Sequence, residues 1–122
     1  MKLHLTTAEN NNLITAYGAD HIEINKKRYE QNLIVMPDAL ILDWQAANFH
    51  DLSNEHFIKI AGLKPEVVLL GTGATHLFLH PKHYQNLTDS GIALECMTTA
   101  AACRTYNILM SEGRSVAAAL II

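Results

Sequence analysis

The strongest constraint on this fold is a continuous apolar run over residues 67–70 that leads directly into Gly71-Thr72-Gly73. Pro65 breaks the chain just before the run, and the glycines indicate a tight turn just after it. A short run of valines and leucines between such breaks predicts a strand that is covered on both faces. Strands of this kind occur in parallel sheets with helices packed against them, so the run predicts an α/β fold.

After residue 50 the chain alternates between helical and extended patterns. End signals and apolar spacing predict one helix from the N-cap Ser53 to Ala61, closed by Gly62. They predict two further helices, over 81–90 with Pro81 at its start and from Thr98 or Thr99 to residue 112. Strands are predicted over 92–96 and 116–122. This order predicts a C-terminal βαβαβ unit with parallel strands and helices packed on the sheet.

The N-terminal half is typical of strands and turns. Alternating or apolar stretches predict strands around Leu3 and Leu5, over 21–25, from Tyr29, over 33–36 and over 39–44. Residues 17–20 and 37–38 are typical of turns, and 25–28 suit an exposed hairpin connection. We therefore predict a single α/β domain over residues 1–122, with a mixed central sheet to which the N-terminal half contributes antiparallel hairpins.

Composition excludes several classes of protein. The 122 residues are 49% hydrophobic and 17% charged, which is typical of a globular chain, and the net charge of −3 argues against nucleic-acid binding. The first residues lack the apolar core of a signal peptide, and the apolar run at 116–122 is far shorter than the roughly 20 residues of a membrane span. Cys96 and Cys103 suit buried thiols in a reducing compartment, so we expect a cytoplasmic protein without a cofactor.

Gly71-Thr72-Gly73 after a buried strand is similar to the start of a dinucleotide-binding fingerprint. That fingerprint requires a third small residue at position 76 and a helix that begins at once. Position 76 is histidine, and the following residues do not start a helix. The simpler interpretation is that the glycines allow positive φ angles or a close approach of the backbone.

A candidate ligand site lies between the glycine turn and the predicted helix start at Thr98-Thr99. Both should lie at the carboxyl ends of neighbouring parallel strands, where open α/β sheets bind ligands. The free N–H groups of a helix start attract anions, so Gly71, Thr72, Gly73, Thr98 and Thr99 predict a pocket for a small anionic ligand. Arg104, Asn107 and Cys103 are the further candidates for its lining.

Each of these residues also has a structural explanation. Thr98 and Thr99 are ordinary helix caps, and Arg104 can pair with a surface carboxylate. Asn107 can bind the backbone of a nearby loop such as the glycine turn. Glu112 and Arg114 flank Gly113 and can lock the corner between helix and strand.

Two other chemistries have candidate residues. His76, His80 and His83 are spaced by four and three, but Pro81 interrupts the helix that would align them as metal ligands. We therefore predict surface or partly buried histidines and no metal site. Cys103 near a helix start is a candidate nucleophile with a lowered pKa, although a buried and inert thiol is the alternative we favour.

Several motifs resemble one family over nearly the whole chain. They are residues 14–18, 33–35, 65–73, 91–92, 95–99, 101–109 and 112–114. Together they are similar to the small Mth-type domain that is shared by mitochondrial complex I assembly factor three, the adipogenesis-associated Mth-domain protein and short bacterial and archaeal proteins of unknown function. The resemblance implies an α/β domain with a mixed sheet and no established reaction, cofactor or catalytic residue. Its mitochondrial member implies a role in assembly through protein contacts.

The function that these observations favour is a non-enzymatic protein-interaction or assembly module that binds a protein partner or itself. The alternative is a small anionic-ligand binder or enzyme that uses the pocket between Gly71-Thr72-Gly73 and the Thr98-Thr99 helix start.

Overall fold

The computed structural model describes residues 11–122, which form two β-sheets and three α-helices. The strands are β1 (Ile14–Gly18), β2 (His21–Ile24), β3 (Lys27–Tyr29), β4 (Leu33–Met36), β5 (Ala39–Ile41), β6 (Val67–Gly71), β7 (Ala93–Met97) and β8 (Val116–Leu120). The α-helices are α2 (Glu55–Leu63), α3 (Gln85–Asp89) and α4 (Thr99–Ser111), and the 3₁₀ helices are η1 (Phe49–Asp51) and η2 (Pro81–Tyr84). The strands expected around Leu3 and Leu5, and the first residues of the predicted domain, lie outside the described range.

The central sheet confirms the predicted mixed α/β architecture. Its strand order is β5-β4-β8-β6-β7, with β6 parallel to both β7 and β8, and β4 antiparallel to β8. All five residues of β6 are buried, as the apolar run predicted. Because β6 has a hydrogen-bonded neighbour on each side and helices above and below it, it forms the middle of the fold.

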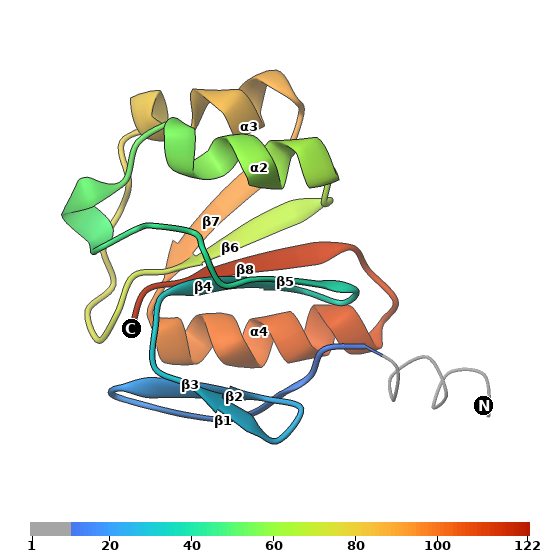
Figure 1. Ribbon diagram of the computed structural model, residues 1–122. Coiled ribbons are helices and arrows are strands. Elements are labelled where there is room, and N and C mark those ends of the chain that lie inside the picture. Colours follow the sequence, from blue (N-terminus) through green and yellow to red (C-terminus); the bar gives the residue numbers. More distant parts are fainter. Residues whose placement is uncertain (1–10) are drawn as a thin grey trace.

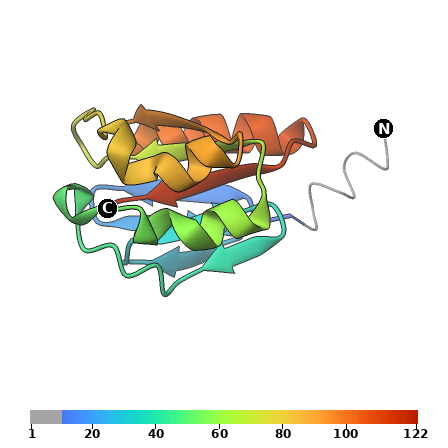
Figure 2. The same ribbon diagram turned by 90° about the horizontal axis from the view of Figure 1, so that it is seen from above.

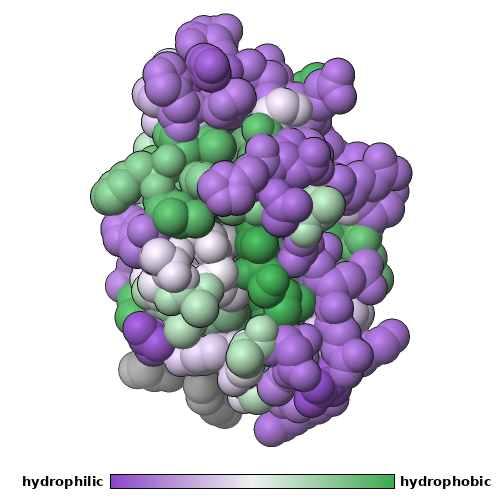
Figure 3. Space-filling model, turned by 90° about the vertical axis from the view of Figure 1, so that its left-hand side faces the viewer, coloured by the Kyte–Doolittle hydropathy of each residue, from purple (hydrophilic) through white to green (hydrophobic). Residues whose placement is uncertain are grey.

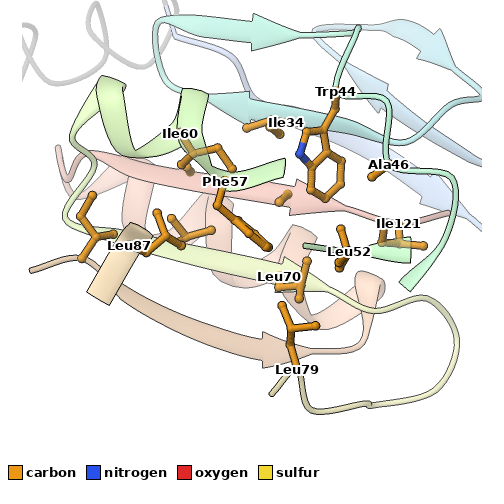
Figure 4. Packing of buried hydrophobic residues seen from close by; sticks show 14 of the residues in the cluster. Ile34, Trp44, Ala46, Leu52, Phe57, Ile60, Leu70, Leu79, Leu87 and Ile121 are labelled. Carbon is orange, nitrogen blue, oxygen red and sulfur yellow. The ribbon is translucent and has the colours of Figure 1, made fainter. Parts of the chain in front are cut away.

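Helices cover both faces of the central sheet (Figures 1 and 2). The helices α2 and α3 lie on one face, where Phe57, Ile60 and Leu87 belong to the same buried cluster as Leu70 (Figure 4). The long helix α4 and the three-stranded sheet β1-β2-β3 lie on the other face. The alanines of β8 alternate between these two cores, since Ala117 and Ala119 belong to the first and Ala118 to the second.

The N-terminal hairpins divide between the two sheets. The antiparallel pair β4–β5 joins the central sheet, whereas β1, β2 and β3 form a sheet of their own. The turn between β2 and β3 has positive φ angles at Asn25 and Lys26, as the favoured two-residue hairpin turn requires at both central positions. The predicted turn over 17–20 is shorter than expected, because Tyr17 and Gly18 still belong to β1.

Several predicted boundaries were wrong. The helix α2 runs past Gly62 to Leu63, because Lys64 takes the left-handed conformation that ends it, with φ 54°. The predicted helix over 81–90 is divided into η2 and α3, and β8 ends at Leu120. The strand predicted over 39–44 is only β5. The ends of helices and strands depend on the backbone conformation of one or two residues, and many different residues can adopt that conformation.

Candidate functional site

The glycine turn and the start of α4 lie side by side at the carboxyl ends of β6 and β7, as predicted. From this edge the chain leaves β6 towards α3 on one face of the sheet and leaves β7 into α4 on the other (Figure 1). Adjacent parallel strands whose connections go to opposite faces leave a crevice between them, which is where open α/β sheets bind ligands.

Thr99 joins three chain segments at this edge. Its backbone N–H donates to the Gly73 carbonyl at 2.9 Å, and its hydroxyl accepts a hydrogen bond from the Gly73 N–H at 2.8 Å. The same hydroxyl donates to the Ile121 carbonyl at 2.5 Å, just past the end of β8. The residue is only 9% exposed, and with these three bonds Thr99 is a structural clamp between the glycine turn, α4 and the residues after β8.

Gly71 is required by close packing. A β-carbon at this position would lie 2.9 Å from the Thr99 hydroxyl oxygen and 3.0 Å from the Thr99 α-carbon. Gly73 has a different requirement, because its φ of 96° is a conformation that other residues rarely adopt. The glycine turn therefore has the roles that the simpler interpretation gave it.

Thr72 holds the loop that follows the turn. Its buried hydroxyl donates to the Thr75 carbonyl at 2.6 Å and accepts from the Leu77 N–H at 3.1 Å. Its own N–H donates to the Met97 carbonyl at 2.9 Å, which ties the loop to the end of β7. These bonds fix the chain immediately before Phe78.

A pocket of about 370 Å³ opens beside the Thr99 clamp. Its lining comes from the β1–β2 turn, the glycine turn, the start of α4 and the chain end: Tyr17, Gly18, Ala19, Gly73, Ala74, Thr98, Thr99, Ala100, Ile121 and Ile122. This volume falls within the range of roughly 300 to 1,000 Å³ that is usual for ligand sites. The molecule carries a band of apolar and near-neutral residues between hydrophilic ones on the side where the chain ends (Figure 3).

The start of α4 has only part of its hydrogen-bonding capacity left for a ligand. The Thr99 N–H is bonded to Gly73, while the Ala101 and Ala102 N–H groups donate to the side chain and the carbonyl of Thr98. Ala100 is the remaining residue of the first turn, and it lines the pocket. Of the two predicted helix starts, Thr98 and Thr99, the N-cap is Thr98.

The predicted companions of this site lie elsewhere. Arg104 donates to the Tyr17 hydroxyl at 2.9 Å, so its partner is a phenol rather than the expected surface carboxylate. Asn107 accepts from the Ile14 N–H at 3.0 Å and donates to the Ile14 carbonyl at 2.8 Å. The prediction that Asn107 binds backbone is confirmed, but the glycine turn is not its partner, because Asn107 joins α4 to β1. Neither residue lines the pocket, although Arg104 holds a tyrosine that does.

Burial raises the pKa of both free cysteines. Burial raises the pKa of Cys103 to about 12, against the smaller opposing effect of the nearby Arg104 charge. Burial also raises the pKa of Cys96, against the smaller effect of a hydrogen bond with the backbone of Leu79. The candidate lowering of the Cys103 pKa by the helix start was therefore wrong, because desolvation of a thiolate inside the core is the larger effect.

The histidines of the third candidate site are distributed along the loop and η2. The His76 ring packs on Phe78 with 4.5 Å between ring centroids, and His80 Nδ1 accepts from the Lys82 N–H at 3.1 Å. The His80 and His83 ring centroids are 6.4 Å apart. Within residues 11–122, no three His, Cys, Asp or Glu side chains are grouped closely enough to hold a metal ion.

The helix-to-strand corner is locked by a residue that sequence reasoning missed. Arg114 pairs with Glu66 at 3.3 Å rather than with Glu112. The Ser115 N–H also donates to Glu66 at 3.2 Å, and this bond together with Arg114 lowers the pKa of the Glu66 carboxyl. The pocket residues Tyr17, Gly18 and Ala19 were missed too, because nothing in a local pattern brings the β1–β2 turn to the start of α4.

No helix within residues 11–122 has the length and apolar character needed to cross a membrane.

Comparison with known proteins finds relatives that match this chain over most of its length. It is 39% identical over 111 residues to NADH dehydrogenase [ubiquinone] 1 alpha subcomplex assembly factor 3 of Danio rerio, covering 89% of this chain and 63% of that protein. It therefore spans about three fifths of the length of that curated relative.

Solved structures show the same fold. A Bordetella parapertussis protein of known crystal structure is 39% identical with a TM-score of 0.85, covering 91% of this chain and 95% of that chain. A Bordetella pertussis protein described as a Mth938-like domain, solved by NMR, is 33% identical with a TM-score of 0.79, covering 90% and 85%. The resemblance to the Mth-type domain is therefore confirmed. The sequence profile of one family matches residues 14–121, and the chain belongs to that family, described as protein of unknown function (DUF498/DUF598).

Proposed function

We propose that this chain is a non-enzymatic protein-interaction or assembly module that works in the cytoplasm. The observation that carries the proposal is the 39% identity, over 89% of the chain, to a protein named as an assembly factor of NADH dehydrogenase. A relative that assembles other proteins must bind them. Because no catalytic constellation is recognised in this family, a protein contact is the property that its members can share.

The surface of the described residues supports this proposal. Three large apolar side chains are strongly exposed, namely Ile58 on α2, Phe78 after the glycine turn and Ile108 on α4. Single exposed apolar residues are ordinary, but aromatic side chains that remain in water are also the usual anchors of protein interfaces.

The test is a search for a stable partner of the full chain. Native mass spectrometry at micromolar concentration should show either a homo-oligomer or, after addition of an extract from the source cells, a complex of defined mass. Tagging the identified partner should recover this chain in return. A chain that remains a partnerless monomer in both measurements would refute the proposed function.

The second candidate function is a small anionic-ligand site in the pocket beside Thr99. Its support is the 370 Å³ volume at the start of α4, where Ala100 and the positive end of the helix dipole face the opening. Gly73, Thr98 and Thr99 line this pocket. Gly71 packs against Thr99, and Thr72 bonds the end of β7. Arg104 acts through Tyr17, and Asn107 positions β1.

Titration of the ¹⁵N-labelled chain with inorganic phosphate and with butyrate tests this second function. We expect saturable chemical-shift changes at Gly73 and Ala100, which A100L should abolish because its side chain fills the pocket. Ile108→Leu, at an exposed position of the same helix, is the matched control. Changes that do not saturate, or that persist in A100L, would exclude an anion site there.

A further inference from the structure

The most exposed large apolar side chain among the described residues is Phe78, at 79%. It does not lie on a loose loop. The preceding residue donates its N–H to the Thr72 hydroxyl at 3.1 Å, and the following residue, Leu79, is buried in the core against Leu70 (Figure 4). The chain is therefore fixed on both sides of a phenylalanine that points into water.

Phe78 forms one wall of a second, smaller hollow. Its volume is about 190 Å³, and its lining is Phe49, His50, Leu52, Phe78, Leu79, His80 and His83. Ligand pockets usually measure roughly 300 to 1,000 Å³, so this hollow is small for a cofactor. It has the size and the aromatic walls that suit one apolar side chain of a protein partner.

The polar side chains around the hollow can all donate a hydrogen bond. His50, His80 and His83 line it, and their ring N–H groups are hydrogen-bond donors. Lys82 lies between two of them in η2. Among residues 11–122 no carboxylate lines the hollow, and the neighbouring Asp51 is directed to the Ala47 N–H at 3.4 Å and to His56 at 3.8 Å.

This local character contrasts with the chain as a whole, whose net charge is −3. The net negative charge repels acidic molecules, so a carboxylate near the hollow would be stabilised only by these particular donors. Imidazole and ammonium donors bind carboxylates more strongly than neutral acceptors. The complementary partner is therefore acidic around an apolar anchor.

We propose that Phe49, His50, Phe78, His80 and His83, which we name the Phe78 surface, dock an acidic segment of a protein partner. One apolar side chain of the segment fills the hollow against Phe78, and flanking carboxylates accept hydrogen bonds from His50, His80 and His83. This inference rests on the proposed interaction function and identifies the surface and the chemistry of the partner.

The test uses the full ¹⁵N-labelled chain and a synthetic nine-residue peptide, a central leucine flanked on each side by four glutamates. We expect chemical-shift changes that cluster at residues of the Phe78 surface and binding that weakens as salt is added. A peptide with glutamines in place of the glutamates should bind at least fivefold more weakly. Equal binding of the two peptides, or changes centred on another surface, would overturn the proposal.

Variants separate this surface from other exposed apolar residues. Phe78→Ala removes a side chain that contributes little to the core, so it should keep the melting temperature and lose at least fivefold in affinity for the glutamate peptide. Ile58→Ala, at a position 58% exposed on α2, is the matched control and should bind as the wild type does. Wild-type affinity in F78A would overturn the proposal.

The outcome also separates this inference from the proposed function. A cellular partner that binds F78A as tightly as the wild type would leave the interaction function standing and overturn the Phe78 surface. A homo-oligomer that F78A dissociates would show that the occupant is a second copy, which also overturns the acidic-partner proposal. A chain with neither partner nor peptide binding would refute both.

Discussion

Replacement of Thr99 by valine tests whether the clamp at the edge of the sheet stabilises the fold. Valine keeps the shape of the side chain and removes the hydroxyl. The Gly73 N–H then loses its acceptor, and the Ile121 carbonyl loses its donor. A buried polar group without a partner costs about 1 to 3 kcal/mol. The Ile121 residue is buried, whereas water can reach the half-buried Gly73, which reduces the cost at that end.

We therefore expect T99V to lower the free energy of unfolding by about 2 to 3 kcal/mol. That is a large part of the roughly 5 to 15 kcal/mol that stabilises a typical domain. For a chain of this length it corresponds to a fall in melting temperature of roughly 8 to 12 °C.

Urea unfolding followed by circular dichroism measures this difference, and two variants serve as controls. T99S keeps the hydroxyl and should lose less than about 1 kcal/mol. T98V removes a single capping bond, from the Ala101 N–H, and should lose about 1 kcal/mol. If T99V is no less stable than both controls, the hydroxyl does not act as a clamp and our reasoning about this edge is refuted.

Three further predictions concern Gly71, Cys103 and Glu66. Gly71→Ala should cost about 1 to 3 kcal/mol through overpacking against Thr99, whereas Gly62→Ala, with open space around it in α2, should stabilise by about 0.5 to 1 kcal/mol; urea titration of both variants checks this. Folding raises the pKa of Cys103 from 9.0 to about 12, so the folded state holds the thiol proton more tightly than the unfolded state does. The free energy of unfolding should therefore fall as pH rises from 9 to 12. Urea titrations at alkaline pH should show a shallower fall for C103A. Folding lowers the pKa of Glu66 below 4.5, so the ionised carboxylate stabilises the fold at neutral pH. The difference in stability between wild type and E66Q should therefore shrink as pH falls below 4.5. A difference that persists at pH 2 would contradict this explanation.

Local sequence patterns were enough to predict the central part of this fold. The apolar run that became β6, the alternation of strand and helix after residue 50, and the proline and glycine signals depend on burial and backbone preference, which act within short windows. The order of elements also predicted that the strands β6, β7 and β8 run parallel, with β7 next to β6, but it did not predict that β8 lies on the other side of β6.

Partners that are distant in sequence could not be predicted. Asn107 bonds Ile14 and Arg104 bonds Tyr17, across 93 and 87 positions of the chain. The sequence indicated that Asn107 in mid-helix needed a partner, but it gave no information on which backbone would supply one. The position of the separate β1-β2-β3 sheet next to α4 decides both contacts, and that position depends on tertiary packing of Ile14, Ile22 and Ile24.

The two threonines at this edge connect the structural and functional interpretations. Thr99 and Thr72 use their hydroxyls for the backbone of the fold, so neither is free to bind a ligand without a loss of stability. Their hydrogen bonds fix the position of two segments, namely the pocket lining at Gly73 and the chain before Phe78. A preorganised surface loses less entropy on binding than a flexible one. Fixed exposure of Phe78 is therefore the property that distinguishes a docking residue from an ordinary apolar residue on a mobile loop.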